Sequence, residues 1–378
     1  MGNVGKWGAG AALIAVLALG VLAGRDVAHH VRAHGPRHHA AAAAQRRASL
    51  LRRSVVSIAW VGDMSLSRKL GLPPASGAGP LEPVRRRLQD ADLALGNLEG
   101  TLGSGGGSKC GHRSKDCFAF QAPASYAGMY ARAGFDVLNL ANNHAADFGP
   151  AGEARTLAAL YGAGVGAAGP PGHVELRSVR GVRVALLGFA PYPWAASLTD
   201  IPKAIELVRR AAARADLVIV MMHAGAEGTD RIHTPIGRET AFGEDRGDTR
   251  RFAHAVVDAG ADLVVGSGPH VLRGVERRRG RLIAYSLGNF LGFNTFERGG
   301  VLSLSGILRV ELDGTGALRG ARWISIRLTG PGTPAIDRSR RAAKLVSSLS
   351  RADFGAAAMT VTGDSRLVPA PGPPHRRG

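Results

Sequence analysis

Six hydrophobic segments of the sequence each end on residues that can bind a metal ion or move a proton. The polar groups at these endings are a carboxylate, an amide or an imidazole: Asp63, Asn97 with Glu99, Asn142-Asn143-His144, His223, His270 and Asn289. In α/β sheets ligands bind beyond the carboxyl ends of the strands, so these endings are predicted to converge on one surface. Oxygen and imidazole ligands without an accompanying Lys, Cys or activated Ser suit hard-to-borderline divalent metals. The pattern therefore predicts a metal site that supports hydrolysis without a protein nucleophile.

The segments that must position these residues predict an α/β fold. Apolar runs predict strands at residues 55–61, 92–95, 137–140, 182–188, 217–222, 263–265 and 282–285, with a β-rich end at 302–312 and 322–328. Helical periodicity predicts helices at residues 81–91, 124–133, 150–162, 201–213 and 249–259. Continuous apolar strands that alternate with helices indicate a sheet covered on both faces.

The same segments resemble a known family. VGDMSLSR, NLEGTL, NLANNHAADFG, HAGAE, DAGADLVVGSGPHV and IAYSLGNF, in this order across residues 54–295, resemble the CapA family of bacterial capsule and poly-γ-glutamate biosynthesis. That family is similar to the calcineurin-like metallophosphoesterases. The resemblance therefore implies a four-layer α/β/β/α sandwich with a metal centre at the strand ends. It also implies a protein anchored outside the cell membrane that takes part in making, exporting or anchoring the polymer.

The resemblance also assigns roles to individual residues. Asp63 resembles the first metal ligand, Glu99 a bridging carboxylate, and His223 and His270 the two late histidine ligands. Asn143 and His144 resemble the pair that offers one metal ligand and one group for the substrate oxyanion. Asn142 and Asp147 resemble the residues that support this pair. Glu227 and Asn289 are further supporting candidates, with an ordinary loop acid and a loop-fixing amide as the equally weighted alternatives.

Two positions depart from the family pattern. Ser65 stands where ordinary metallophosphoesterases have a histidine, and Gly268 stands where many family members have another. The ligands that remain suffice for one ion, which weakens the case for a second. The expected cofactor is a divalent ion of Mn, Mg, Fe or Zn, bound in one or two copies. A scaffold without metal is the third possibility that these losses leave open.

The amino-terminal segment predicts export or anchoring. Residues 7–24 are eighteen uncharged, mostly apolar residues between Lys6 and Arg25, which is about the minimum length for a bilayer helix. We favour an uncleaved single-pass anchor at residues 1–24 with the globular part outside the cell membrane. A signal cleaved after Ala23, which would make the protein secreted, is the alternative.

The formal net charge of +19 lies mostly at the two ends of the chain. Residues 1–53 carry 8 basic and 1 acidic side chains, and residues 338–378 carry 8 and 2. The His/Arg-rich stretch 25–53 is predicted to be a solvated linker, residues 54–330 the globular domain, and residues 331–378 a basic, largely disordered tail with one short helix near residues 338–350. A mildly basic domain with basic ends gives little support to a nucleic-acid partner.

Two cysteines, Cys110 and Cys117, lie close together in a Gly/Ser/Lys-rich stretch. In an exported protein such a pair most simply forms a loop-closing disulfide, and a metal knuckle would need more ligands than His112 alone supplies. The glycine-rich residues 103–107 are not followed by the Lys-Ser or Lys-Thr of a phosphate-binding loop, so no nucleotide site is expected. The sequence also has no Gly-x-Ser-x-Gly motif, which disfavours a serine hydrolase.

Two functional classes follow from these observations. The first is a membrane-anchored envelope factor that binds or processes an anionic, poly-γ-glutamate-like polymer, with membrane polymer-synthase subunits as possible partners. The second is an extracytoplasmic metal-dependent phosphoesterase that acts on a small or lipid-linked phosphate. Loss of a metal ligand would abolish turnover by the second, whereas the first could bind its polymer without any turnover.

Overall fold

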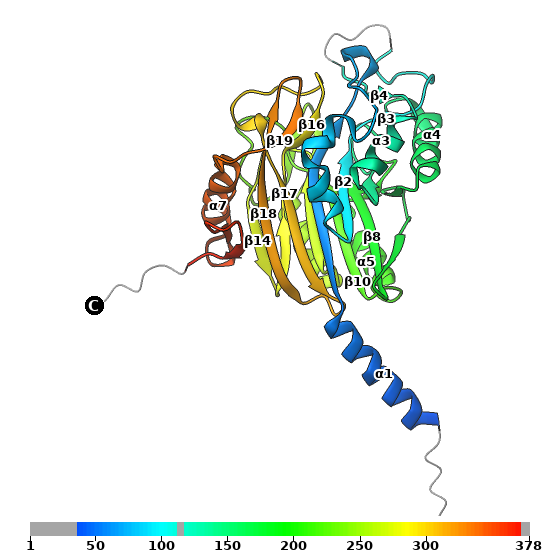
Figure 1. The fold of residues 1–378 in the computed structure, drawn as a ribbon, viewed down its shortest axis with the longest axis vertical. Coiled ribbons are helices and arrows are strands. Elements are labelled where there is room, and N and C mark those ends of the chain that lie inside the picture. The colour runs from blue at the N-terminus through cyan, green and yellow to red at the C-terminus, as the bar shows by residue number, and fades with distance from the viewer. Residues whose placement is uncertain (1–35, 112–116, 372–378) are drawn as a thin grey trace, which may run out of the picture. The chain divides into compact units, whose positions relative to one another are not determined.

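Two β-sheets stacked face to face form the centre of the structure, a computed structural model that describes residues 36–111 and 117–371 (Figure 1). The strands of the first sheet are β1 (Val55–Ser65), β2 (Leu93–Leu98), β5 (Val137–Asn139), β6 (Gly166–Ala168), β16 (Asn289–Gly292), β17 (Leu304–Asp313), β18 (Leu318–Thr329) and β19 (Thr333–Ile336). Their order is β19-β18-β17-β1-β2-β5-β6, with β16 paired to β1. Because β1, β2, β5 and β6 run parallel, their carboxyl ends lie at one edge of the sheet.

The second sheet also has a parallel centre. Its strands are β7 (Glu175–Val179), β8 (Val182–Ala190), β9 (Ala196–Ser197), β10 (Leu217–His223), β13 (Leu263–Ser267), β14 (Val275–Arg278) and β15 (Arg281–Ala284). The order is β14-β15-β13-β10-β8-β7, with β9 paired to β8. Strands β8, β10, β13 and β15 are parallel, so this sheet also presents several carboxyl ends at one edge.

The main hydrophobic core lies between the two sheets. Val, Ile and Leu side chains from both sheets fill it together with Trp60 and Trp323, which are fully buried. Trp60 Nε1 donates a hydrogen bond to the Gly266 carbonyl at 3.2 Å, which ties β1 to β13 across the layers. The continuous apolar strands of the sequence are therefore explained by burial on both faces.

Helices cover the outer face of each sheet. A 3₁₀ helix (Gly79–Val84) and the helices α2 (Arg85–Gln89), α3 (Tyr126–Ala133) and α4 (Gly149–Gly162) pack on the first sheet. The helices α5 (Ile201–Ala212) and α6 (Thr249–Ala259) pack on the second. The architecture thus has the four layers α/β/β/α that the family resemblance implies. Helix α6 has the predicted bounds because Asp248 caps its first turn and Gly260 ends it at φ 119°.

Three short hairpins or strand pairs and further single turns complete the fold. The pairs are β3 (Thr101–Leu102) with β4 (Gln121–Ala122), β11 (Glu239–Ala241) with β12 (Glu244–Gly247), and β20 (Met359–Val361) with β21 (Leu367–Pro369). Short 3₁₀ turns occur at Arg68–Leu70, Gly300–Ser303 and Gly355–Ala357. A disulfide joins Cys110 to Cys117, as predicted, with the two Cα atoms 5.5 Å apart.

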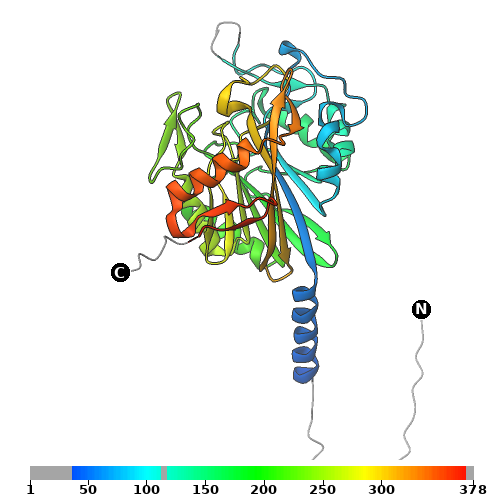
Figure 2. The same ribbon diagram turned by 60° about the vertical axis from the view of Figure 1, so that its left-hand side comes forward.

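The carboxyl-terminal part of the chain differs from the predicted disordered tail. Helix α7 (Arg341–Phe354) and the β20–β21 hairpin pack against the domain, and Ala342, Val346, Met359 and Leu367 are buried in the main core. Figure 2 shows this segment, in red, lying across the rest of the domain. The prediction was wrong because the apolar residues here come in short groups between Pro, Gly and Arg, which hides how much surface they bury.

Several element boundaries also differ from the prediction. Strand β1 continues through Asp63 to Ser65, so Asp63 lies within the strand and not after it. The predicted helix at residues 81–91 is instead a 3₁₀ helix that contains Pro83, followed by the five-residue α2. Proline has no N–H to donate to an α-helical ladder, which explains the break.

The structure describes the start of the chain from residue 36. Residues 1–45 and 46–378 separate into two units, and helix α1 (Pro36–Arg53) contains the alanine run 40–44, whose high helix propensity explains helical order inside the predicted linker. The apolar segment 7–24 lies outside the described residues. Within the described ranges, no helix is both long enough and apolar enough to cross a membrane.

Candidate metal centre

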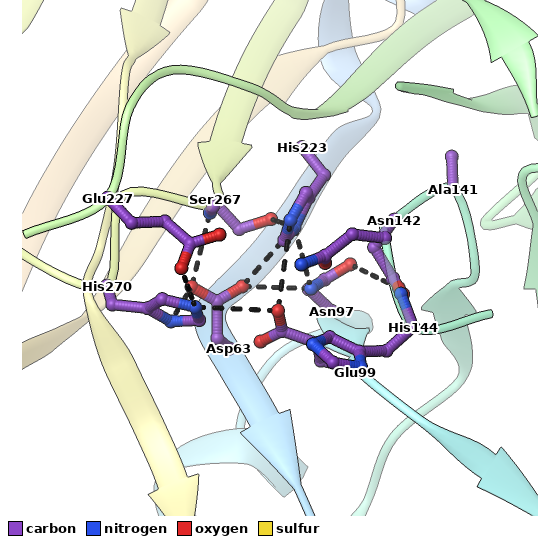
Figure 3. Close-up of polar contacts among 12 residues, drawn as sticks. Asp63, Asn97, Glu99, Ala141, Asn142, His144, His223, Glu227, Ser267 and His270 are labelled. Carbon is purple, nitrogen blue, oxygen red and sulfur yellow. Dashed lines mark hydrogen bonds and ion pairs between the residues drawn. The ribbon is translucent and has the colours of Figure 1, made fainter. Parts of the chain in front are cut away.

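The cluster of polar side chains lies where carboxyl ends of strands from both sheets meet (Figure 3). Asp63 is in β1, Glu99 follows β2, and His223 is the last residue of β10. Gly62 allows the turn before β16 to approach β1, because a Cβ at this position would lie 1.9 Å from the Gly288 carbonyl oxygen. That carbonyl accepts a hydrogen bond from the Asp63 N–H at 3.0 Å, which fixes the backbone of the first candidate ligand.

Three side chains bring oxygen and nitrogen ligand atoms within 4.8 Å of one another: Asp63, Glu99 and His270. His270 Nδ1 lies 3.3 Å from Asp63 Oδ2, and His270 Nε2 lies 3.5 Å from Glu99 Oε1. Both carboxylates are completely buried, and the His270 side chain is 13% exposed. Two buried carboxylates and one imidazole form a ligand set that suits a divalent ion.

His223 extends this group, and its free ring atom indicates a ligand. Its Nε2 is buried without a hydrogen-bond partner and lies 3.8 Å from Glu99 Oε1. Ser267 Oγ lies 3.3 Å from His223 Nδ1, so this ring nitrogen has a polar neighbour while Nε2 is the ring atom nearest Glu99. Both oxygens of Glu99 are also buried without a partner. Buried polar atoms are nearly always satisfied, so unsatisfied atoms on the neighbouring residues Glu99 and His223 fit a cation bound between them.

A network of amides fixes the Asp63 carboxylate, and its centre is Asn97, which was expected at a strand ending but was assigned no individual role. Asn97 Nδ2 donates to Asp63 Oδ1 at 2.8 Å and lies 3.2 Å from His223 Nδ1. Asn97 Oδ1 accepts from Asn139 Nδ2 at 2.9 Å and from Asn142 Nδ2 at 3.2 Å. The signal was present, because residues two apart along a strand share a face and Asn97 precedes Glu99 by two.

His144 sits beside the cluster in a separate hydrogen-bonded arrangement. Its Nδ1 lies 2.8 Å from Asp147 Oδ2, and Asp147 also accepts from the Phe120 N–H at 2.6 Å and pairs with Lys109 Nζ at 2.7 Å. Asn142 Oδ1 accepts the His144 N–H at 3.0 Å, so the backbone is fixed as well. A carboxylate that accepts the Nδ1 proton leaves His144 Nε2 available to accept or donate a proton.

The candidate supporting residues Glu227 and Asn289 both contact His270. Asn289 Oδ1 lies 2.8 Å from His270 Nδ1, and Glu227 Oε2 lies 3.6 Å from His270 Nε2. Glu227 also pairs with the buried Arg246 at 2.6 Å, a partner that the sequence did not reveal. A hydrogen bond to the second ring nitrogen orients an imidazole that binds a metal.

Asn143, the remaining predicted ligand, makes no hydrogen bond or ion pair with the cluster among the described residues. Asn143 Oδ1 is buried without a hydrogen-bond partner, and the Asn143 carbonyl accepts from Lys109 Nζ at 3.2 Å. Ser65 is fully buried, and its hydroxyl has no partner. Gly268, which stands where many family members have a histidine, has a φ of 113°. Its N–H donates a hydrogen bond to Asp63 Oδ2 at 3.2 Å, so a backbone group contacts the cluster at this position. The ligand roles of Asn143 and of the other site residues stay predictions.

Burial and mutual charge set the protonation of the cluster. Burial lowers the pKa of His223 to about 3, so this ring is neutral. Burial also opposes protonation of His270, but Glu99, Asp63 and Glu227 together raise its pKa to about 10. Burial raises the pKa of Glu99 well above its usual range, and the charges of Asp63 and Glu227 add to the effect. The pKa of Asp63 is lowered, because His270 outweighs the effect of burial. In the metal-free protein, the proton on His270 thus neutralises part of the charge of the carboxylates, as a bound divalent cation would.

A cavity of ≈ 420 Å³ opens next to the cluster, with His144, Glu227 and His270 in its wall. Four phenylalanines line it: Phe118, Phe120, Phe242 and Phe296. Phe118 is 59% exposed and Phe242 82% exposed, which is unusual for such large apolar side chains. The described residues that line this cavity include Glu227 and Glu297 but no Lys or Arg. The wall beside the cluster therefore suits an apolar group better than a chain of negative charges.

The chain is similar to known proteins of bacterial capsule synthesis. The profile of the family described as "Bacterial capsule synthesis protein PGA_cap" matches residues 57–294. The chain is 30% identical over 260 residues to the PGA biosynthesis protein CapA of Bacillus subtilis, covering 63% of each protein. It is 36% identical over 182 residues to the capsule biosynthesis protein CapA of Bacillus anthracis, covering 42% of this chain and 40% of that one. The matches thus span less than two thirds of the length of these relatives.

Solved structures of similar fold were also found. The NAD nucleotidase of Haemophilus influenzae is 12% identical, with a TM-score of 0.42, over 80% of this chain and 63% of that one. The 5'-nucleotidase precursor of Thermus thermophilus is 15% identical, with a TM-score of 0.40, over 79% and 59%. Similarity at this level does not indicate a function.

Proposed function

Because the chain belongs to the bacterial capsule synthesis family, we propose that it is a cell-envelope accessory protein of poly-γ-glutamate-type capsule biosynthesis with a metal-dependent hydrolytic site. The family profile covers more than half of the chain and includes each predicted metal ligand. The polymer is proposed from the names of the Bacillus relatives, which are longer than the part that matches.

One observation carries the metal site. Both oxygens of Glu99 and Nε2 of His223 are buried without partners, beside Asp63 and His270. A buried polar atom without a hydrogen-bond partner costs about 1–3 kcal/mol, so a protein retains such atoms where a ligand compensates the cost. The geometry supports one ion held by Asp63, Glu99 and His270, with His223 as a fourth ligand. An ion bound there supplies Lewis acidity and lowers the pKa of water.

The residues around the metal centre support proton transfer. Burial lowers the pKa of His144 despite the opposing effect of Asp147, so the ring is neutral near pH 7 and can accept a proton through Nε2. Lys109 and the Phe120 N–H hold Asp147 in place, which keeps the ring orientation fixed. His144 is therefore the group that we assign to general acid–base chemistry.

The location proposed is the outer face of the cell membrane. The uncharged segment 7–24 with Lys6 and Arg25 at its ends supports a single-pass anchor. The Cys110–Cys117 disulfide supports an oxidising compartment for the domain, because cytosolic thiols are kept reduced.

Elemental analysis of the purified full-length chain tests the metal site. The chain is incubated with Mn, Zn, Fe or Mg and desalted, beside an Asp63→Asn/His270→Ala variant and an Asp258→Asn/His233→Ala control. Asp258 and His233 lie outside the cluster and pair with Arg278 and Asp353. We expect about one ion per chain in the parent and control, and none in the cluster variant. Equal, negligible metal in all three proteins would overturn the proposal of a metal-dependent site.

A second candidate function is hydrolysis of a phosphate ester that carries an apolar chain, and the phenylalanine-lined cavity supports it. A long-chain alkyl phosphate ester should be hydrolysed with a lower KM than a short-chain ester of the same leaving group. Phe242→Ser should remove that difference, because this side chain is 82% exposed at the cavity. Equal KM values for both esters in the parent protein would contradict this candidate.

A further inference from the structure

A second, chemically opposite cavity lies on the carboxyl-terminal side of the domain. It has a volume of ≈ 430 Å³, and five arginines line it: Arg277, Arg309, Arg319, Arg322 and Arg366. They come from β14, β17, β18 and the β20–β21 hairpin, which lies beside β18. Figures 1 and 2 show β17, β18 and β14 together on this side, below the strand ends that carry the metal centre. We call this cavity the arginine groove.

Three of these arginines form a row across neighbouring strands. Arg309 of β17 is directly opposite Arg322 of β18, and Arg322 is directly opposite Arg366 in an antiparallel bridge. Directly opposed side chains share one face of a sheet, with Cβ atoms roughly 4.5–5.5 Å apart. Like charges in this position are destabilising unless something neutralises them. The row is therefore a feature that a bound anion explains.

The protein itself neutralises only part of this charge. Arg319 pairs with Asp313 at 2.6 Å, and Arg366 pairs with Asp364 at 2.7 Å. In the part of the chain that the structure describes, Arg277, Arg309 and Arg322 have no carboxylate within ion-pair distance.

Hydrogen bonds to backbone carbonyls fix two of the unpaired guanidinium groups without removing their charge. Arg309 donates to the Asp90 carbonyl and Arg322 to the Asp364 carbonyl, the latter at 3.3 Å. Glu311, two residues from Arg309 and exposed, is the one carboxylate among the described residues that line the groove. The groove thus keeps a net positive charge for an external ligand.

We propose that the arginine groove binds a linear polycarboxylate chain, at a site separate from the metal centre. The inference rests on the proposed function, because poly-γ-glutamate is such a chain, with one carboxylate on each residue. A row of single positive charges matches repeated single negative charges, and guanidinium groups can bind carboxylates with two hydrogen bonds. Leu318, Leu367 and Pro369 in the wall can contact the methylene groups of the chain.

Two observations favour a polymer over a membrane surface as the occupant. The site is concave, whereas binding to a lipid surface is strengthened by apolar side chains that insert into it. None of the exposed large apolar side chains of the described residues lies in the groove. The phenylalanine-lined cavity at the metal centre has no Lys or Arg among the described residues of its wall, so it lacks the guanidinium groups that bind carboxylates with two hydrogen bonds.

Fluorescence anisotropy with a fluorescein-labelled γ-linked glutamate decamer tests the proposal. The full-length chain is used in EDTA, so that binding does not depend on metal, and the basic ends of the chain contribute equally in every variant. Arg309→Gln/Arg322→Gln should weaken binding at least tenfold. The control Arg209→Gln/Arg214→Gln removes two exposed charges at α5, on the other sheet, and should change binding less than twofold.

A variant that is expected to tighten binding makes the test stricter. Glu311→Gln removes the only negative charge among the described residues of the lining and should tighten binding severalfold. The Arg309→Gln/Arg322→Gln variant should keep the urea midpoint of the parent or raise it, because it removes a like-charge pair. Weaker binding therefore cannot be explained by unfolding if the midpoint is kept.

Three results would overturn the proposal. The groove and control variants could lose affinity equally, which would mean non-specific attraction by total charge. Glu311→Gln could leave binding unchanged. Vesicles with 30% phosphatidylglycerol could bind in a way that depends on Arg309 and Arg322 while the decamer does not, which would indicate a membrane-docking surface. The Asp63→Asn/His270→Ala variant should bind the decamer normally, so a failure of the metal site is distinguishable from a failure of the groove.

Discussion

The proton that the cluster binds in the metal-free protein gives a prediction with a defined sign. His270 is raised to a pKa of about 10, and burial raises the pKa of Glu99 well above its usual range. In the unfolded chain a histidine loses its proton near pH 6.5 and a glutamate near pH 4.3, roughly. Between the pKa of an unfolded histidine, about 6.5, and the pKa of about 10 for His270, the folded, metal-free protein therefore binds more protons than the unfolded chain. By linkage its free energy of unfolding must fall as the pH rises.

The size of the effect follows from the width of the window. Stability that comes from a raised pKa is fully present below the unfolded pKa and is lost as the pH approaches the folded value. One extra proton changes the free energy of unfolding by about 1.4 kcal/mol per pH unit. Between pH 7 and 9 the metal-free protein should therefore lose about 2–3 kcal/mol. His223, with a pKa of about 3, loses its proton far below this range and does not contribute.

Urea denaturation in EDTA at pH 7, 8 and 9 measures this slope. The Glu99→Gln/His270→Gln variant leaves neither group to titrate, so its free energy of unfolding should change by less than about 1 kcal/mol over the same range. A single His270→Gln variant is insufficient, because Glu99 alone can retain the proton. A flat profile in the parent, or an equal slope in the double variant, would refute the assignment of the proton to this pair.

Two further predictions concern the core and a buried ion pair. Trp60→Phe should lower the free energy of unfolding by about 1 kcal/mol more than Trp323→Phe, because both rings are fully buried but only Trp60 loses a hydrogen bond. Urea denaturation of the two variants measures the difference, and equal losses would contradict it. Arg273, 1% exposed, binds Glu239 through two hydrogen bonds at 2.9 and 2.6 Å, so Arg273→Met should cost about 3–5 kcal/mol. Adding Glu239→Leu should recover part of that loss, and a further loss would show that the unpaired carboxylate was not its cause.

Local patterns of the sequence predicted the strands, the helices that cover them and the convergence of the strand ends, whereas the four layers were implied by the family resemblance. Continuous apolar runs identified the strands that are buried on both faces, and Asp248 with Gly260 marked both ends of α6. The family membership, expected from six ordered motifs, is confirmed by the profile match to residues 57–294. Parallel strands place their endings at one edge, so the position of the cluster required no knowledge of side-chain contacts.

Other features depend on pairings that no local pattern specifies. Asn97 lies inside a strand, and its central place in the amide network arises only when β1, β2 and β5 align. Lys109 reaches the site from a loop and Arg246 from the β11–β12 hairpin, both far away in sequence from the residues that they contact. The packing of α7 was missed because its buried face includes two serines, Ser347 and Ser350, beside its apolar residues. Each of these contacts is set by tertiary structure, which overrides local propensity.

The register of β17 against its neighbours links the two candidate binding sites. Arg309 is opposite Ala59 of β1, four residues before Asp63, or roughly 13 Å along the strand. In β17 and β18 the side chains alternate, so Leu308 and Trp323 face the core while Arg309 and Arg322 line the groove. A slip of one residue would bury both arginines and expose the tryptophan. The same pairing that buries the core therefore fixes the arginine row, and any variant that preserves this core should also preserve the spacing of its charges.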